Sequence, residues 1–277
     1  MRLAALLLLA GLASQLFAAS PARAPGGEAS DPSPTEQGHE LAAASSMPKL
    51  ALVIDDLGAN PARDNRALAL PGPVALAILP DTRHAPSLAQ RAYEAGKTVL
   101  LHLPMAPAIG PYSWHQGLSP EQLQQRLDNA LRRVPHALGV NNHMGSQMTD
   151  QKQPMLSLMT ELQARHLFFL DSRTNPHTVA AAAAQQVQLA SLSRDVFLDD
   201  DPAPAAVADQ FRAAMKLARK QGSVVIIGHP HASTLALLER ELPRLRVMGI
   251  DWIGMEQMIA LRGNRAMAAH GSLGIYR

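Results

Sequence analysis

Asp55 and Asp56 lie side by side at the end of an apolar run, residues 50–54. Such a run is typical of a strand that is buried on both faces of a parallel sheet. Neighbouring carboxylates repel each other and lose hydration on burial, so the pair indicates either a bound cation or two separate roles. The alternative is one helix-capping residue beside one solvated residue. The pair therefore marks the carboxyl end of this strand as a candidate site.

Three histidines also follow apolar runs of the strand type, and they are His102, His143 and His229. A single histidine in such a position is more often a satisfied structural residue than a ligand. Three of them beside an acidic pair favour metal chemistry, because His102 and His143 can each offer a neutral imidazole nitrogen. One aspartate would complete a His-His-carboxylate set that leaves a position open for water.

The remaining groups fit the hydrolysis of an amide. The second aspartate would act as a base toward the attacking water, and His229 would protonate the departing nitrogen. The sequence contains no cysteine, so a metal must be held by histidine and carboxylate. Zinc, cobalt, manganese and nickel all suit such ligands.

The elements that must position these residues alternate between strands and helices. Apolar runs predict strands at 50–54, 74–79, 98–101, 136–140, 167–170, 188–192, 223–227 and 248–253. Amphipathic stretches, with capping signals at their ends, predict helices at 61–70, 87–93, 119–134, 154–162 and 201–221. In a closed or nearly closed parallel β/α barrel, all strand carboxyl ends open onto one face. The aspartates and histidines are therefore expected to converge there.

Composition and the first fifty residues indicate one exported α/β domain. The 277 residues are 47% hydrophobic and carry a formal net charge of +2, with no basic cluster that would indicate nucleic-acid binding. Residues 1–24 predict a signal peptide or an uncleaved amino-terminal anchor. Residues 25–48 have the composition of a disordered linker. We expect the catalytic domain at 49–262, a tail at 263–277, and a periplasmic or envelope-associated location.

Six segments resemble, in order, the divergent polysaccharide deacetylase family, which is similar to the NodB-type carbohydrate esterases. The segments are LVIDDLG at 52–58, LHLPM at 101–105, GVNNHMGS at 139–146, FLDSRT at 169–174, RDVFLD at 194–199 and IGHP at 227–230. The resemblance implies a NodB-like fold, which is a distorted parallel (β/α) barrel of about seven strands. It also implies an exported, envelope-associated protein.

The resemblance assigns a role to each candidate by position. Asp55 resembles the family base, Asp56 the metal carboxylate, His102 and His143 the metal ligands, and His229 the acid. It thus implies a hydrolase that removes an N-acyl (acetyl) group from a cell-envelope glycan. The hydrolase would use a divalent metal, and zinc is the metal that we expect. The expected partner is an N-acetylated polysaccharide or peptidoglycan.

Two differences from the family pattern leave a second interpretation open. NodB-type enzymes take both imidazoles from one His-x-x-x-His segment, whereas Ala106 and Gln147 lie four residues after His102 and His143. The Arg-x-Pro-aromatic motif of active deacetylases is also missing. The alternative is a catalytically inactive, envelope glycan-binding or regulatory protein that retains the metal pocket.

Three further residues are candidates for supporting the site. Asp171 would orient His143 or His229 as a carboxylate behind the ligand, or else cap the turn that follows it. Arg173 and Arg194 would brace the acidic site or meet an anionic substrate group, or else have surface and packing roles.

One aromatic residue and one acidic run complete the candidates. Trp114 lies in a Pro- and Gly-rich loop after His102, where it would stack on a sugar ring or pack within the loop. The run 199–201 precedes Pro202 and indicates the start of a helix, where acidic side chains are favourable, and not a second metal site.

Overall fold

The computed structural model describes residues 47–263. The predicted leader at 1–24, nearly all of the linker at 25–48 and all but the first residue of the tail at 263–277 lie outside this range. Those three assignments therefore stay predictions. Within the described range, every helix is too short or too polar to cross a membrane.

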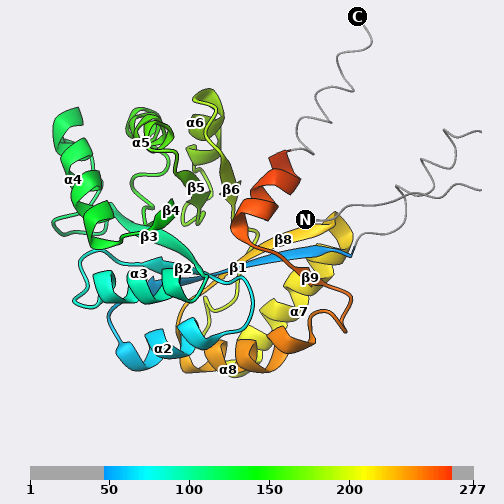
Figure 1. Ribbon diagram of the computed structural model, residues 1–277. Coiled ribbons are helices and arrows are strands. Elements are labelled where there is room, and N and C mark those ends of the chain that lie inside the picture. Colours follow the sequence, from blue (N-terminus) through cyan, green and yellow to red (C-terminus); the bar gives the residue numbers. More distant parts are fainter. Residues whose placement is uncertain (1–46, 264–277) are drawn as a thin grey trace, which may run out of the picture. The chain divides into compact units, whose positions relative to one another are not determined.

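The strands of the described range form one sheet in which every pairing is parallel. The order across it is β6-β5-β4-β3-β2-β1-β8-β7, and β9 pairs with the first part of β1 (Figure 1). The strands are β1 (Lys49–Leu57), β2 (Ala75–Ile78), β3 (Thr98–Met105), β4 (Ala137–Met144), β5 (Phe168–Asp171), β6 (Ser191–Ser193), β7 (Val196–Phe197), β8 (Ser223–Gly228) and β9 (Asp251–Trp252).

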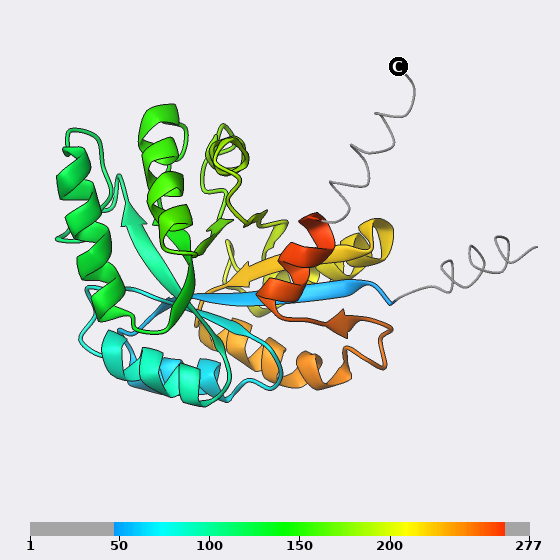
Figure 2. The same ribbon diagram turned by 45° about the horizontal axis from the view of Figure 1, so that its top comes forward.

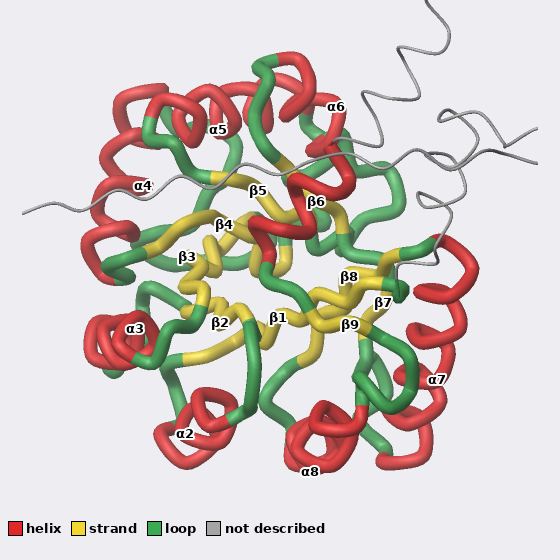
Figure 3. Tube along the Cα trace, turned by 45° about the vertical axis from the view of Figure 1, so that its right-hand side comes forward, coloured by secondary structure: helices red, strands yellow, loops and turns green. Residues whose placement is uncertain are grey.

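The sheet curls into a nearly closed barrel. Its two edge strands, β6 and β7, are separated by only two residues of chain, 194 and 195, so the two edges must lie close together. Figure 3 shows the strands gathered at the centre and the helices around them. The prediction of a distorted parallel (β/α) barrel is confirmed, and the strands beyond the expected seven are two or three residues long.

The helices cover the outside of the barrel (Figure 2). They are α2 (Pro61–Ala69), α3 (Ala85–Glu94), α4 (Pro120–Arg133), α5 (Lys152–Ala164), α6 (Ala180–Gln186), α7 (Pro204–Gln221), α8 (Ala232–Glu241) and the 3-10 helix η1 (Leu242–Arg244). The Ser119 capping box begins α4 and left-handed Gly222 ends α7, as predicted. The starts of α3, α5 and α7 differ from the predicted ones by two or three residues, because element boundaries are the part of a structure that a sequence specifies least.

Two apolar layers result from the alternation of side chains along each strand. One layer lies between the sheet and the helices, and on β1 it takes Leu50, Leu52 and Ile54. The other fills the barrel interior and takes Ala51 and Val53 together with Met255 and Met258 from a helical stretch at 255–263. This stretch lies beside the starts of β4 and β5, so it covers the end of the barrel opposite the strand carboxyl ends.

The barrel interior contains one contact that leaves no room for a side chain. Gly139 on β4 pairs in register with Phe168 on β5, and a Cβ on Gly139 would lie 2.6–2.7 Å from three atoms of the Phe168 ring. We therefore expect Gly139→Ala to lower the free energy of unfolding by about 1–3 kcal/mol, because the ring must move out of a packed layer.

Thermal unfolding measures this effect. Leu138→Ala, on the same strand at a side chain that is 45% exposed, is the matched control and should change stability by less than about 0.5 kcal/mol. Equal midpoints for wild type and Gly139→Ala would contradict the close packing of Phe168 on the glycine.

Candidate active site

Strand alternation brings three of the predicted site residues to one end of the barrel interior. Asp55, His102 and His229 each lie two residues beyond an interior side chain on the same strand or on its extension. Those interior residues are Val53, Leu100 and Ile227. Because the strands are parallel, all three side chains emerge at the carboxyl ends of the strands, at one end of the barrel.

Asp56 reaches the same place through an irregularity in β1. Simple alternation would direct its carboxylate toward the helices. Its φ is 58°, and the pairing of β1 with β2 shifts register between Ile54 and Leu57. A left-handed backbone costs a non-glycine residue roughly 1–2 kcal/mol, and aspartate is among those that tolerate it best. This bulge turns the second carboxylate back toward the first.

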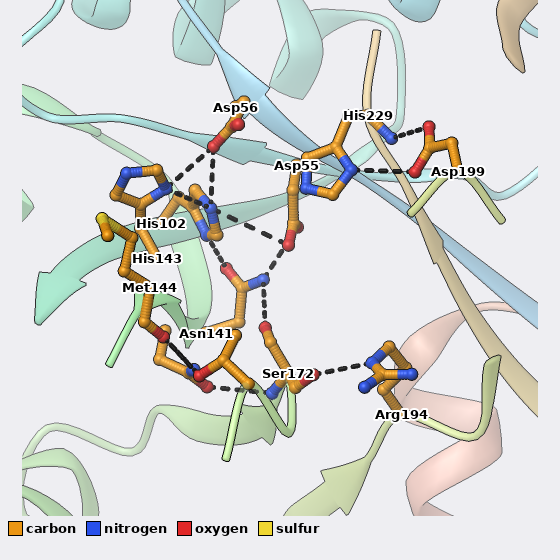
Figure 4. A network of polar contacts seen from close by, with 12 residues as sticks. Asp55, Asp56, His102, Asn141, His143, Met144, Ser172, Arg194, Asp199 and His229 are labelled. Carbon is orange, nitrogen blue, oxygen red and sulfur yellow. Dashed lines mark hydrogen bonds and ion pairs between the residues drawn. The ribbon is translucent and has the colours of Figure 1, made fainter. Parts of the chain in front are cut away.

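The structure brings the Asp56, His102 and His143 side chains together. Asp56 Oδ1 lies 2.9 Å from His143 Nδ1 and 3.2 Å from His102 Nε2, and the two nitrogens are 3.2 Å apart (Figure 4). Asp56 Oδ1 is buried and yet accepts no hydrogen bond of acceptable geometry. A buried polar atom without a partner is costly. The three atoms fit the ligand set of a divalent cation.

Charge at this cluster also suits a cation. Burial raises the pKa of the Asp56 carboxyl, but its short polar contacts with His102 and His143 and the charges of those two residues outweigh burial and leave that pKa well below its ordinary value. Burial lowers the pKa of His102, and the charges of Asp55 and Asp56 outweigh it and raise that pKa. The site thus concentrates negative charge beside two imidazoles, which a metal ion would neutralise.

Asn141 links this cluster to Asp55. Its Oδ1 lies 2.9 Å from His102 Nδ1, and its Nδ2 donates to Asp55 Oδ1 at 2.8 Å and to Ser172 Oγ at 3.3 Å. An amide oxygen only accepts, so in neutral His102 the proton lies on Nδ1 and Nε2 presents its lone pair. Asn141 thereby sets the tautomer that a metal ligand needs.

Asp55 is the buried carboxylate beside the cluster. The whole residue is about 1% exposed, and its Oδ2 lies 3.8 Å from His102 Nε2. Burial raises its pKa, although His102, His229 and the Asn141 hydrogen bond oppose the rise. A carboxylate with a raised pKa holds a proton more readily, which suits a general base.

His229 lies on the other side of Asp55 and is held by Asp199. His229 Nδ1 lies 2.9 Å from Asp199 Oδ1, and Asp199 Oδ2 accepts from the His229 backbone N at 2.7 Å and from Thr234 Oγ1 at 2.6 Å. Burial lowers the pKa of His229, but the Asp199 hydrogen bond and the charges of Asp55, Asp199 and Asp56 raise it to about 9. His229 is therefore cationic near neutral pH.

The prediction that Asp199 belongs to a helix start is wrong. The buried Asp199 carboxylate is the partner of His229, and Asp201 provides the turn contact instead by accepting from the Ala203 backbone N. Asp199, His229 and His231 also form a second group of potential ligand atoms. Both oxygens of Asp199 are already occupied by hydrogen bonds.

Asp171 does not support a histidine as a second carboxylate. Its neighbours Phe168 and Leu170 point into the barrel, so alternation directs Asp171 outward. Its carboxylate accepts from the Arg173 backbone N at 2.8 Å and from Thr178 Oγ1 at 3.0 Å, and it caps the turn after β5. Turn capping, the other role expected for Asp171, is therefore the one observed.

The two predicted arginines lie beside the site without binding its carboxylates. Arg194 donates to the backbone oxygens of Ser172 at 2.6 Å and Arg173 at 3.0 Å, and its guanidinium lies 3.7 Å from the ring centre of Phe197. It therefore braces the loop after β5. Arg173 is exposed, and a role for it toward substrate stays a prediction.

The prediction that Trp114 stacks on a sugar ring is wrong. Trp114 is fully buried in the layer between sheet and helices, and its backbone bridges to the end of β3 near Met105. Loop packing, the alternative stated for this residue, is what the structure contains. Burial of a loop aromatic depends on tertiary contacts that a loop sequence does not reveal.

Comparison with known families agrees with the geometry. The model of the family described as divergent polysaccharide deacetylase matches residues 52–259. The uncharacterized protein YibQ of Escherichia coli is 41% identical over 196 residues, which cover 69% of this chain and 61% of that protein. An uncharacterized protein of Haemophilus influenzae is 43% identical over 201 residues, covering 71% and 72% of the two chains. This chain thus spans about three fifths of the Escherichia coli relative.

Two solved structures share the fold. An uncharacterized protein from Agrobacterium tumefaciens superposes with a TM-score of 0.73 at 20% identity, over 79% of this chain and 91% of that chain. The peptidoglycan deacetylase PdaC from Bacillus subtilis superposes with a TM-score of 0.50 at 13% identity, over 82% and 98% of the two chains. At these identities the likeness shows the barrel alone.

The Asn141 contacts generate a test of the metal-ligand cluster. Asn141→Leu removes the acceptor that fixes the His102 tautomer, so we expect the affinity for zinc to fall by about 10–100-fold. Competition with a chromophoric chelator measures it. Ser172→Ala is the matched control, because it removes only the 3.3 Å contact to Asn141 and should bind zinc as the wild type does. Equal affinities for Asn141→Leu and Ser172→Ala would exclude the tautomer role.

Proposed function

This chain belongs to the divergent polysaccharide deacetylase family, and from that premise we propose that it is a metal-dependent hydrolase that removes an N-acyl group from a cell-envelope glycan. The observation that carries the proposal is the convergence of Asp56, His102 and His143 ligand atoms within 2.9–3.2 Å of one another. Asp55 and His229 lie beside that cluster, where a base and an acid are needed.

In this proposal Asp56 Oδ1, His102 Nε2 and His143 Nδ1 would hold the metal, which we take to be zinc. A divalent cation there would supply the charge that polarises the amide carbonyl and lowers the pKa of water. The protein's part is to keep Asp56 ionised and His102 in the correct tautomer. Asn141 does the second of these through its Oδ1.

Two protein groups move the protons. Asp55 Oδ1 is occupied by Asn141, so Oδ2 accepts the proton of the attacking water. His229 Nδ1 is occupied by Asp199, so Nε2 donates its proton to the departing amine. A pKa of about 9 keeps His229 protonated before the reaction.

The location is part of the proposal as well. The apolar start of the chain at 1–24 supports export as a signal peptide or an anchor, and an envelope glycan is then the accessible substrate. An N-acetylated polysaccharide or peptidoglycan is the substrate class that we infer from the family.

Acetate release from N-acetylated glycan fragments tests the reaction. We expect Asp55→Asn to lower the rate by about 10²–10⁴-fold, because the base is lost while the ligand set remains. Asp209→Asn, at an exposed carboxylate on α7, is the matched control and should keep the wild-type rate. Bound metal is measured on all three proteins.

The same measurement separates the hydrolase from a glycan-binding protein. Bound metal without acetate release, together with equal glycan affinity in wild type and Asp55→Asn, would identify a binder. Identical background acetate from the wild type and Asp55→Asn would remove the hydrolase proposal.

The His229–Asp199 pair predicts the alkaline side of the pH profile. His229 must be protonated, so the rate should fall as the pH rises through the pKa of about 9. In Asp199→Asn one stabilising negative charge is lost, and the fall should move to lower pH by about 1–3 units.

Asp201→Asn is the control for this profile, since Asp201 carries a similar charge but contacts the Ala203 backbone N. Its alkaline limb should match that of the wild type. If Asp199→Asn kept the wild-type limb, another group would be the acid.

A further inference from the structure

A cavity of about 260 Å³ opens beside His143 at the carboxyl ends of β2, β3 and β4. Its walls are mainly apolar and include Leu79, Pro107, Ile109 and Met144. Because His143 also lines it, the cavity adjoins the metal-ligand cluster directly. None of the roles proposed above uses this space.

Two of its large apolar side chains are exposed to solvent and are not packed into the core. Ile109 is 90% exposed and Met144 is 44% exposed. Met144 also has a φ of 56°, and its carbonyl oxygen is held by Asn142 Nδ2 at 2.8 Å and Thr174 Oγ1 at 2.6 Å. Strained residues that their surroundings hold in place cluster at ligand-binding sites.

The position of the acid determines which part of a substrate reaches this cavity. The carbonyl carbon of an amide carries the nitrogen on one side and the acyl chain on the other. His229, which protonates the nitrogen, follows β8 on one side of β1, whereas the cavity residues follow β2, β3 and β4 on the other side. In Figure 4, His143 and Met144 likewise lie across Asp56 and Asp55 from His229.

From this geometry we propose that the cavity beside His143 binds the N-acyl chain, and that the preferred substrate carries a neutral acyl group longer than acetyl. The inference rests on the proposed function, because the amide orientation comes from the roles of the metal ligands and His229.

The size and charge of the cavity specify that chain. A water molecule takes up about 30 Å³ in the liquid, and a methyl group is of similar size, so an acetyl group would leave most of the space unfilled. Asp81 lines the rim and is exposed, and its negative charge disfavours a chain that ends in a carboxylate.

Binding of alkyl hydroxamates tests the cavity without any turnover. Hydroxamates chelate zinc, so acetohydroxamate, butanohydroxamate, hexanohydroxamate and octanohydroxamate place chains of increasing length beside the metal. Calorimetry with the zinc-loaded full chain should show the affinity rising by about fourfold per methylene until the cavity is filled.

A paired variant locates the effect. Ile109→Ser combined with Met144→Asn removes the apolar wall, and asparagine accepts the left-handed backbone at position 144. The gain per methylene should fall to less than about twofold. Val247→Ser removes an equally exposed apolar side chain, 92% exposed, outside the cavity, and should keep the full gain.

The outcomes separate this inference from the proposed function. If the hydroxamate affinity does not change with chain length, the cavity's role is overturned even if acetate is released. The same holds if the paired variant keeps the gain in affinity per methylene. A gain that the paired variant loses supports the cavity's role, and acid release from N-acyl glycans then decides independently whether the site hydrolyses what it binds.

Discussion

The site depends on one backbone irregularity that places two adjacent carboxylates at the same end of the barrel. A regular strand would send Asp55 inward and Asp56 outward, because neighbouring side chains alternate. The bulge in β1 and the positive φ of Asp56 bring both inward. Two like charges so close are unfavourable unless cations are near. A cation shared by Asp56, His102 and His143 would provide that charge.

Two separate hydrogen-bond networks divide the chemistry around this pair. On one side, Asn141 connects His102 to Asp55, so the tautomer of a ligand and the orientation of the base depend on one amide. On the other side, buried Asp199 holds His229 through its ring and its backbone. The first network fixes which ring nitrogen of neutral His102 carries the proton, and the second favours a cationic imidazole at His229. The same residue type therefore serves two different purposes on the two sides of Asp55.

Most of the barrel could be predicted because its strands are apolar runs ended by polar residues, as at Asp55, His102 and His229. The roles of the other site residues depended on contacts between parts of the chain that are far apart in the sequence. Asp171 has the same pattern, but its strand is out of phase with the others. Asp199 lies in an acidic run that also suits a helix start, and only the fold places His229 beside it. Trp114 has no distinguishing signal in its loop.

The strands β6 and β7 are the two edges of the sheet and do not pair with each other. The barrel therefore has an open seam between them, and this seam has a mechanical consequence. His229 follows β8, which pairs with the two-residue edge strand β7, and its ring packs on Phe197 with centroids 5.6 Å apart. The metal ligands, by contrast, follow β1, β3 and β4, none of which pairs with β6 or β7. Edges open at lower free energy than the middle of a sheet. A bulky polymer that widens the seam would therefore displace the proton donor while the ion-binding half keeps its shape.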